Sequence, residues 1–146
     1  MKRVAKSSAG FTLVELLVVI GITGLVLAVV VSTRPKATAV RLAAAARSVA
    51  ITLQMARAQA MASNTETVVR IDAQNKQFGF ARSMHAFPQG VSVALTVAAT
   101  ERVGESGGVR FYPDGQSTGG EILLTLDGRS SRVAVNWLTG ESQLSP

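Results

Sequence analysis

The chain reads Gly10-Phe11-Thr12-Leu13-Val14-Glu15 near its start, and an apolar run follows from Leu16 to Val31 that only small residues interrupt. Glu15 is the only charged residue among the 21 residues from Phe11 to Val31. A helix of that length rises about 31 Å, which matches the roughly 30 Å hydrocarbon core of a bilayer. We therefore expect residues 11–31 to span a membrane.

The residues before this span set its orientation. Lys2, Arg3 and Lys6 precede it without any acidic residue, and a basic flank of this kind normally stays in the cytoplasm. The carboxy-terminal body is then translocated. An ordinary secretory signal has a shorter apolar region, of about 7 to 15 residues. A signal anchor that is never cleaved has the same hydropathy, so the choice depends on Glu15.

Glu15 is costly in a membrane helix, by about 2.5 to 3.5 kcal/mol on insertion scales, and such a residue usually has a partner. Cleavage after Gly10 would create a cationic amine at Phe11. The carboxylate of Glu15 on a neighbouring subunit can neutralise that amine, which turns two costly charges into one intermolecular pair. This argument disfavours the plain anchor.

The segment Gly10-Phe11-Thr12-Leu13-Val14-Glu15, followed by Leu16-Leu17-Val18-Val19-Ile20, resembles the class III signal of type IV pilins and type II secretion pseudopilins. The resemblance implies cleavage after Gly10 by a prepilin peptidase and methyltransferase. It also implies N-methylation of Phe11 and a role for Glu15 in subunit registration during assembly.

A second helix is expected after the span. Arg34-Pro35-Lys36 predicts a kink or a short break, because proline disfavours helix at the preceding residue and lacks a backbone donor. Helical sequence then resumes to Ser63. Its apolar positions fall within about 80° of the helical wheel. This predicts a helix with one narrow apolar face and a polar remainder, packed on a sheet. Half of the apolar positions are alanine, which disfavours a coiled coil. They are Leu42, Ala46, Val49, Leu53, Ala56 and Ala60.

From Thr65 onward the pattern changes to short β-branched runs between turn residues, which predicts strands. Ala73-Gln74-Asn75, Pro88-Gln89-Gly90, Pro113-Asp114-Gly115 and Asp127-Gly128 are expected to form the connecting turns. Residues 98–108 are polar and Gly-rich, and are expected to form a loop that is either a contact site or slack. The expected strands are residues 65–72, 76–82, 91–98, 109–112, 121–127 and 132–137.

Two segments of the body extend the resemblance. Residues 108–120 (GVRFYPDGQSTGG) and 136–140 (NWLTG) resemble the H-type pseudopilin and FimT-type minor pilin family. The resemblance implies a type IV pilin-like α+β fold. The expected organisation is a leader at residues 1–10, a transmembrane and assembly helix at 11–33, an amphipathic helix at 34–64 and a periplasmic β domain at 65–146.

Two functions compete within this family. One is a minor pseudopilin, a structural subunit of the type II secretion pseudopilus that assists export of folded proteins. The other is a FimT-type minor pilin of a type IV pilus, which acts in pilus assembly or DNA uptake. Residues 138–146 contain one acid and no base, whereas phosphate binding needs Lys or Arg. Only Arg129 and Arg132 form a small candidate patch, so we favour secretion and do not expect nucleic acid as a partner.

Composition limits other functions. The net formal charge is +6, but three of the 15 positive charges precede Gly10, so 12 basic residues against 9 acidic residues leave +3 after it. The chain has no cysteine and one histidine. A triad of His85, Asp114 and Ser117 would need three separate loops to converge, and Asp72, Asp114 and Asp127 are isolated from one another. We expect neither an enzyme nor a metal or cofactor site.

The resemblance also implies partners and a location. The expected partners are the prepilin peptidase and methyltransferase, the major and other minor pseudopilins, the inner-membrane assembly platform, and the membrane itself through residues 11–31. The expected location is the bacterial inner membrane, crossed once, with the N-terminus cytoplasmic and the body periplasmic until the subunit enters the pseudopilus.

Overall fold

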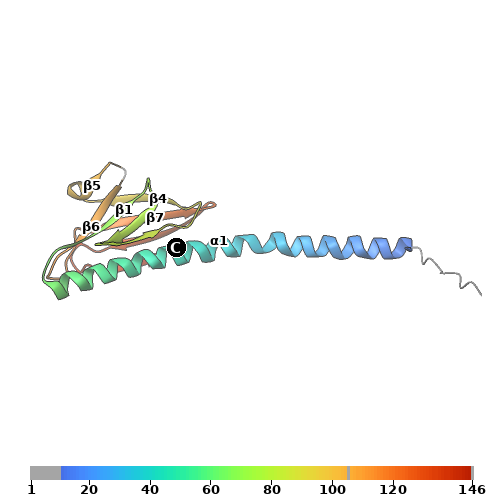
Figure 1. Ribbon diagram of the computed structural model, residues 1–146, viewed down its shortest axis with the longest axis horizontal. Helices are drawn as coiled ribbons and strands as arrows, with labels where there is room; N and C mark the ends of the chain where they lie inside the picture. The colour runs from blue at the N-terminus through green and yellow to red at the C-terminus, as the bar shows by residue number, and fades with distance from the viewer. Residues whose placement is uncertain (1–10, 105, 146) are drawn as a thin grey trace, which may run out of the picture. The chain divides into compact units, whose positions relative to one another are not determined.

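The computed structural model describes residues 11–104 and 106–145, with side chains throughout these ranges except at residues 31–36. Within these ranges, one long helix, α1 (Leu13–Ser63), precedes nine strands and one short 3-10 helix, η1 (Ala99–Glu101) (Figure 1). The chain divides into two compact units whose boundary lies between Lys36 and Ala37. Each unit is described by itself below.

The helix α1 has no interruption in its assigned span. The short break expected at Arg34-Pro35-Lys36 is therefore absent. Proline at a helix interior removes one hydrogen bond and disfavours helical dihedrals in the preceding residue; here those local costs do not end the helix.

Within the second unit, residues 37–63 of α1 pack on the sheets through the predicted apolar stripe. All six predicted positions are buried, and the four from Val49 to Ala60 are fully so. Ala45 and Thr52 are also buried, and the Thr52 hydroxyl is satisfied by donating to the carbonyl of Ser48 at 2.9 Å. Alanine at three stripe positions allows close approach to the strands.

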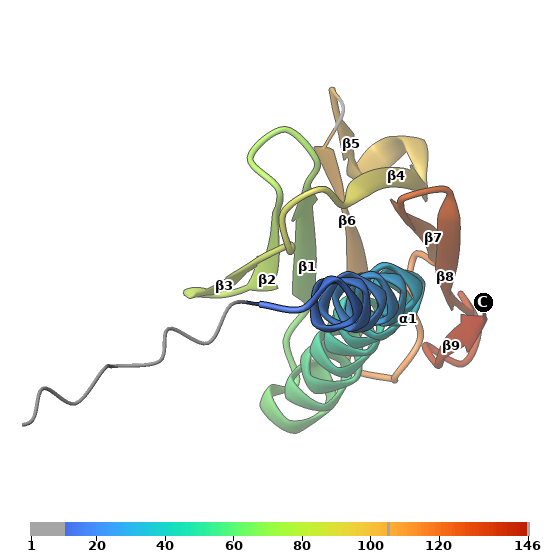
Figure 2. The ribbon, with the colours of Figure 1, turned by 90° about the vertical axis from the view of Figure 1, so that its right-hand side faces the viewer.

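The strands form two antiparallel sheets. The five-stranded sheet has the order β3-β2-β1-β6-β5, and the four-stranded sheet has the order β4-β7-β8-β9. In Figure 2, β1, β2 and β3 lie on one side of residues 37–63 of α1, and β7, β8 and β9 lie on the other. The strands are β1 (Thr67–Asp72), β2 (Gln77–Phe80), β3 (Ser83–Ala86), β4 (Ser92–Val97), β5 (Arg102–Val103), β6 (Ser106–Phe111), β7 (Gly120–Leu126), β8 (Arg129–Val135) and β9 (Ser142–Ser145).

One hydrophobic core joins the helix to both sheets. The helix contributes Val49 and Leu53, the five-stranded sheet contributes residues such as Ile71 and Phe111, and the four-stranded sheet contributes residues such as Ile122. Each of these side chains is fully buried. All residues of the core cluster lie between Leu42 and Val135, so this core belongs to the second unit.

Six predicted strands are present with shifted ends, and the predicted α+β class is confirmed. Asp127 and Gly128 form a two-residue hairpin in which both φ angles are positive, at 48° and 76°, as a type I′ turn requires. The sequence analysis missed three edge strands, β3, β5 and β9. Residues 98–108 are accordingly not one loop, because they include η1, β5 and the start of β6.

Candidate functional site

The first candidate surface is the start of α1. The Thr12 hydroxyl accepts a hydrogen bond from the Glu15 backbone N–H at 3.2 Å, so Thr12 caps the helix that begins at Leu13. Phe11 is 77% exposed and Glu15 is exposed in the first turn. The amino end of a helix favours a carboxylate electrostatically. Gly10, the expected cleavage position, lies outside the described residues.

The capping role of Thr12 was missed by the sequence analysis. The signal was present, because Thr12 and Glu15 have the Thr-x-x-Glu spacing of a capping box. The expected pairing of Glu15 with an amine concerns another subunit and is a separate matter from this local contact.

The apolar span behind Glu15 is exposed throughout. Leu13–Val30 is long and apolar enough to cross a membrane, and none of it is buried in the structure. The Thr23 hydroxyl donates to the Val19 carbonyl at 2.7 Å, which satisfies a polar group that would otherwise be costly in hydrocarbon. These residues therefore present an apolar helix surface that only a bilayer or other apolar helices can cover.

A second exposed apolar surface lies on residues 37–63 of α1. We call it the outer stripe. At 100° per residue its members fall within about 60° of the wheel, opposite the buried stripe. The prediction that the rest of this helix surface is polar is therefore wrong in part, because three large apolar side chains are exposed there: Val40 by 69%, Ile51 by 49% and Met55 by 58%. The outer stripe comprises Val40, Ala44, Ile51, Met55, Ala58 and Ala62.

The two body segments that carry the resemblance meet each other. The Ser117 N–H donates to the Trp137 carbonyl at 2.9 Å, and the Ser117 hydroxyl donates to the Asn136 carbonyl at 3.1 Å. The helix joins them, because Arg57 Nε donates to the Gly115 carbonyl at 3.0 Å. These contacts are structural, as the turn residues led us to expect.

A charged cluster lies on the five-stranded sheet. The Arg110 guanidinium donates to Glu101 at 2.8 Å and to Glu66 at 2.7 Å. These two hydrogen bonds, that of Glu101 foremost, raise the pKa of Arg110 above its ordinary value. At the other end of β1, the Asn75 backbone N–H and side-chain amide donate to the Asp72 carboxylate, and they lower its pKa below the ordinary value.

Each side chain considered for catalysis or metal binding that is named here forms a hydrogen bond with a partner outside that group. His85 lies on β3 and contacts Ser83 at 3.3 Å, Asp114 accepts from the Gln116 N–H, and the Ser117 hydroxyl is bonded to the backbone of Asn136. Asp127 accepts from Thr38. Within residues 11–104 and 106–145, no group of three or more His, Asp or Glu side chains is placed to hold a metal ion.

The two arginines of the candidate basic patch differ. Arg132 forms an ion pair with Glu121 at 3.2 Å, and both side chains are largely exposed. Arg129 is exposed at the start of β8, next to the Asp127-Gly128 turn. One of the two charges is therefore partly neutralised by a neighbouring strand.

Comparisons with known proteins identify the family to which this chain belongs. A family model described as "Type II transport protein GspH" matches residues 45–140, and one described as "Prokaryotic N-terminal methylation motif" matches residues 5–31. The chain belongs to the GspH family. It is 33% identical over 147 aligned residues to the type II secretion system protein H of Xanthomonas campestris pv. campestris, covering 98% of this chain and 86% of that protein.

The fold of this GspH-family chain is similar to solved structures. The type IV minor pilin FimU of Pseudomonas aeruginosa matches with a TM-score of 0.58 and 14% identity over 72% of this chain and 88% of that one. The minor pseudopilin EpsH of Vibrio cholerae matches with a TM-score of 0.58 and 15% identity over 72% of this chain and 96% of that one. At such identities these matches show the pilin-like α+β fold, which both classes of filament share.

The predicted family and its structural, non-enzymatic character are thus confirmed. The GspH-family chain is a minor pseudopilin of the type II secretion system. Its methylation motif implies processing by a prepilin peptidase, and the family implies partners in a pseudopilus. Its apolar amino-terminal helix is consistent with an inner-membrane anchor.

Proposed function

We propose that this minor pseudopilin is cleaved after Gly10, is N-methylated at Phe11, and then leaves the inner membrane to enter a pseudopilus by helix packing. The observation that carries the proposal is the apolar helix Leu13–Val30, which is exposed throughout and begins within the Phe11-to-Glu15 segment. In the membrane, lipid covers this surface. In a filament, the helices of neighbouring subunits cover it.

Glu15 is the assembly residue in this proposal. Its carboxylate pairs with the amine of Phe11 on a neighbouring subunit, and the pair offsets the cost of each charge in apolar surroundings. Thr12 supports the arrangement because its hydroxyl caps the same helical turn that carries Glu15. Thr12 and Glu15 are thereby held together at the amino end of the helix.

The outer stripe extends the packing surface beyond the membrane span. An exposed apolar stripe opposite a packed face has no role in the stability of the unit itself, whereas it buries apolar area when another helix lies against it. The proposed partners are the major and other minor pseudopilins, with the inner-membrane platform acting during assembly. The residues after the span form the periplasmic domain.

The experiment is to replace Glu15 by Ala in the full-length protein, in a strain that lacks the native copy. The variant is expected to be inserted and cleaved normally, as followed by the loss of the leader, but to be depleted from the pseudopilus and to reduce secretion. Glu15→Asp is the matched control, since it keeps the carboxylate on the same turn, and it should retain more assembly. Normal incorporation of Glu15→Ala would remove Glu15 from the mechanism.

A further inference from the structure

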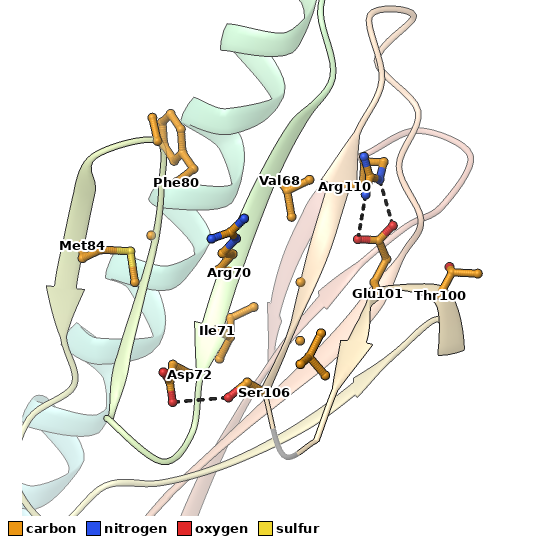
Figure 3. Close-up of a pocket in the computed structure, with 15 residues that line it drawn as sticks. Val68, Arg70, Ile71, Asp72, Phe80, Met84, Thr100, Glu101, Ser106 and Arg110 are labelled. Carbon is orange, nitrogen blue, oxygen red and sulfur yellow. Dashed lines mark hydrogen bonds and ion pairs between the residues drawn. The ribbon is translucent and has the colours of Figure 1, made fainter.

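A hollow of about 900 Å³ lies on the five-stranded sheet. The strand β1 explains which face it occupies. Val69 and Ile71 are fully buried in the core, so Val68, Arg70 and Asp72 point to the opposite face, where they line the hollow. Figure 3 shows α1 behind the sheet and these side chains in front of it. The hollow is therefore separate from the helix surfaces proposed for assembly.

The middle of the hollow is an arginine between two glycines. In the strand register, Arg70 is opposite Gly79 on β2 and opposite Gly108 on β6, and Gly79 is in turn opposite Met84 on β3. Residues directly opposite each other project to the same face of a sheet. The row across four strands is thus Met84, Gly79, Arg70 and Gly108, and no side chain stands on either side of the arginine.

The backbone requires glycine at both positions. A Cβ on Gly79 would collide with the carbonyl oxygen of Ser83. A Cβ on Gly108 would lie 2.8 Å from Cγ1 of Val68 and 3.0 Å from the Val69 carbonyl oxygen. For this steric reason no side chain can stand beside Arg70 at either position.

The other charged groups that line the hollow are already bonded. Arg110 is paired with Glu101, and Asp72 accepts hydrogen bonds from Asn75 and from the Ser106 hydroxyl. Figure 3 shows both interactions at the edges of the hollow, with Arg70 between them. Within the described residues, the side chain of Arg70 makes no hydrogen bond and no ion pair. A guanidinium is always charged and fits a carboxylate with two parallel hydrogen bonds.

The borders of the hollow are apolar in part. Met84 is 45% exposed and Val103 is 78% exposed, and Phe80 also lines the hollow. Arginine, methionine and aromatic residues are enriched in protein interfaces, where arginine is often an energetic centre. Apolar borders around one free guanidinium suit an acidic side chain flanked by apolar residues.

We propose that this hollow, the Arg70 hollow, docks an extended segment of another protein that carries a Glu or Asp between apolar residues. The carboxylate pairs with Arg70, the segment's backbone lies over the row of Gly79, Arg70 and Gly108, and its apolar side chains two positions before and after the acidic residue, which share its face in an extended segment, contact Met84 and Val103. This docking does not depend on the route by which the subunit enters a pseudopilus.

The test uses the full chain in detergent micelles and two blocked peptides, acetyl-Val-Gly-Glu-Gly-Val-amide and its Gln counterpart. Binding is followed by the NMR signal of the Arg70 side-chain Nε–H. The Glu peptide should bind saturably, and about two- to fivefold more tightly than the Gln peptide, as an exposed ion pair predicts. Arg70→Gln should abolish this preference, whereas Arg129→Gln, on the other sheet, should leave it unchanged.

Two further measurements keep the proposal falsifiable. Met84→Glu places a carboxylate on the exposed edge strand at the border of the hollow, and it should weaken binding of the Glu peptide severalfold without altering the core. Binding of glutarate tests whether a small molecule with a carboxylate binds the Arg70 hollow as tightly as the peptide does. Equal affinity for glutarate and the peptide, equal affinity for the Glu and Gln peptides, or no effect of Arg70→Gln would each overturn the docking surface. Preserved amide spectra exclude unfolding as the cause.

Discussion

Arg57 on α1 donates a hydrogen bond from Nε to the carbonyl oxygen of Gly115, at 3.0 Å, across 58 residues of sequence. Gly140 packs against both partners, since a Cβ there would lie 2.9 Å from Arg57 Nε and would collide with the Gly115 carbonyl oxygen. The helix and the two turn segments therefore meet at one point. The sequence motifs of these two turn segments have a structural role at this joint.

The joint predicts a large effect of Gly140→Ala. Gly140 has φ of +66°, so alanine adds backbone strain of about 1–2 kcal/mol to overpacking of about 1–3 kcal/mol. We expect a loss of about 2–5 kcal/mol in the free energy of unfolding. Urea unfolding of the full chain in detergent, followed by fluorescence of the single tryptophan, Trp137, measures it.

Gly128→Ala is the matched control. Gly128 has φ of +76°, but nothing lies within 4 Å of the Cβ position. Only the backbone strain of about 1–2 kcal/mol applies there. Equal losses for the two variants would mean that the contact with Arg57 and Gly115 is not tight.

The two faces of α1 predict opposite phenotypes. Leu53→Ala removes a fully buried side chain and should cost about 2–5 kcal/mol of stability. The double variant Ile51→Ser/Met55→Ser changes exposed positions, so its stability should change by no more than about 0.5 kcal/mol per substitution. It should nevertheless reduce incorporation into the pseudopilus severalfold, as measured by crosslinking to neighbouring subunits in cells.

A stable double variant that assembles normally would show that the outer stripe is not a packing surface. A destabilised double variant would show that these residues support the core after all. Arg47→Ala, a change at a neighbouring exposed position of the same helix, controls for general effects of altering this surface.

These two faces also show how far sequence reasoning reaches. The buried stripe was predictable because leucine and valine recur with helical period and six positions agree. The outer stripe has as many alanines as the buried stripe, so the two faces carry similar apolar signals and the sequence analysis recognised only one of them. The missing break at Pro35 shows that one proline is a local penalty, which a long helix can tolerate.

The edge strands and the Arg70 hollow needed the structure for different reasons. Ser83-Met84-His85-Ala86 has no β-branched residue, so β3 carries no strand signal. The hollow depends on register, because Gly79 and Gly108 flank Arg70 only after β2 and β6 pair with β1. No single segment contains that information.

Asp72 supplies a prediction about pH. Hydrogen bonds from the Asn75 backbone and side chain, in that order, lower the pKa of its carboxyl group below 3.8. Its contribution to stability is therefore fully present above pH 3.8 and is lost as the pH falls through the lower folded value. In Asn75→Ala the backbone donor remains and the side-chain donor is lost, so the pKa should rise part of the way to 3.8. A ¹³C NMR titration of the carboxyl group measures this, and an unchanged pKa would refute the role of the side chain.

DNA binding distinguishes secretion from a DNA-uptake pilus, and the structure predicts that it is weak. Residues 138–145, which include β9, contain Glu141 and no Lys or Arg, and Arg132 is engaged by Glu121 at 3.2 Å. Affinity for DNA comes from released counterions and falls steeply with salt. The full chain in neutral detergent should therefore show no salt-sensitive binding to a fluorescent duplex at physiological ionic strength.

Glu121→Gln frees Arg132 and should increase binding at low salt if these arginines contact phosphate at all. Salt-sensitive binding by the unaltered protein that Arg129→Glu/Arg132→Glu abolishes would instead support the pilus, because two arginines on β8 would then suffice to hold the backbone of DNA.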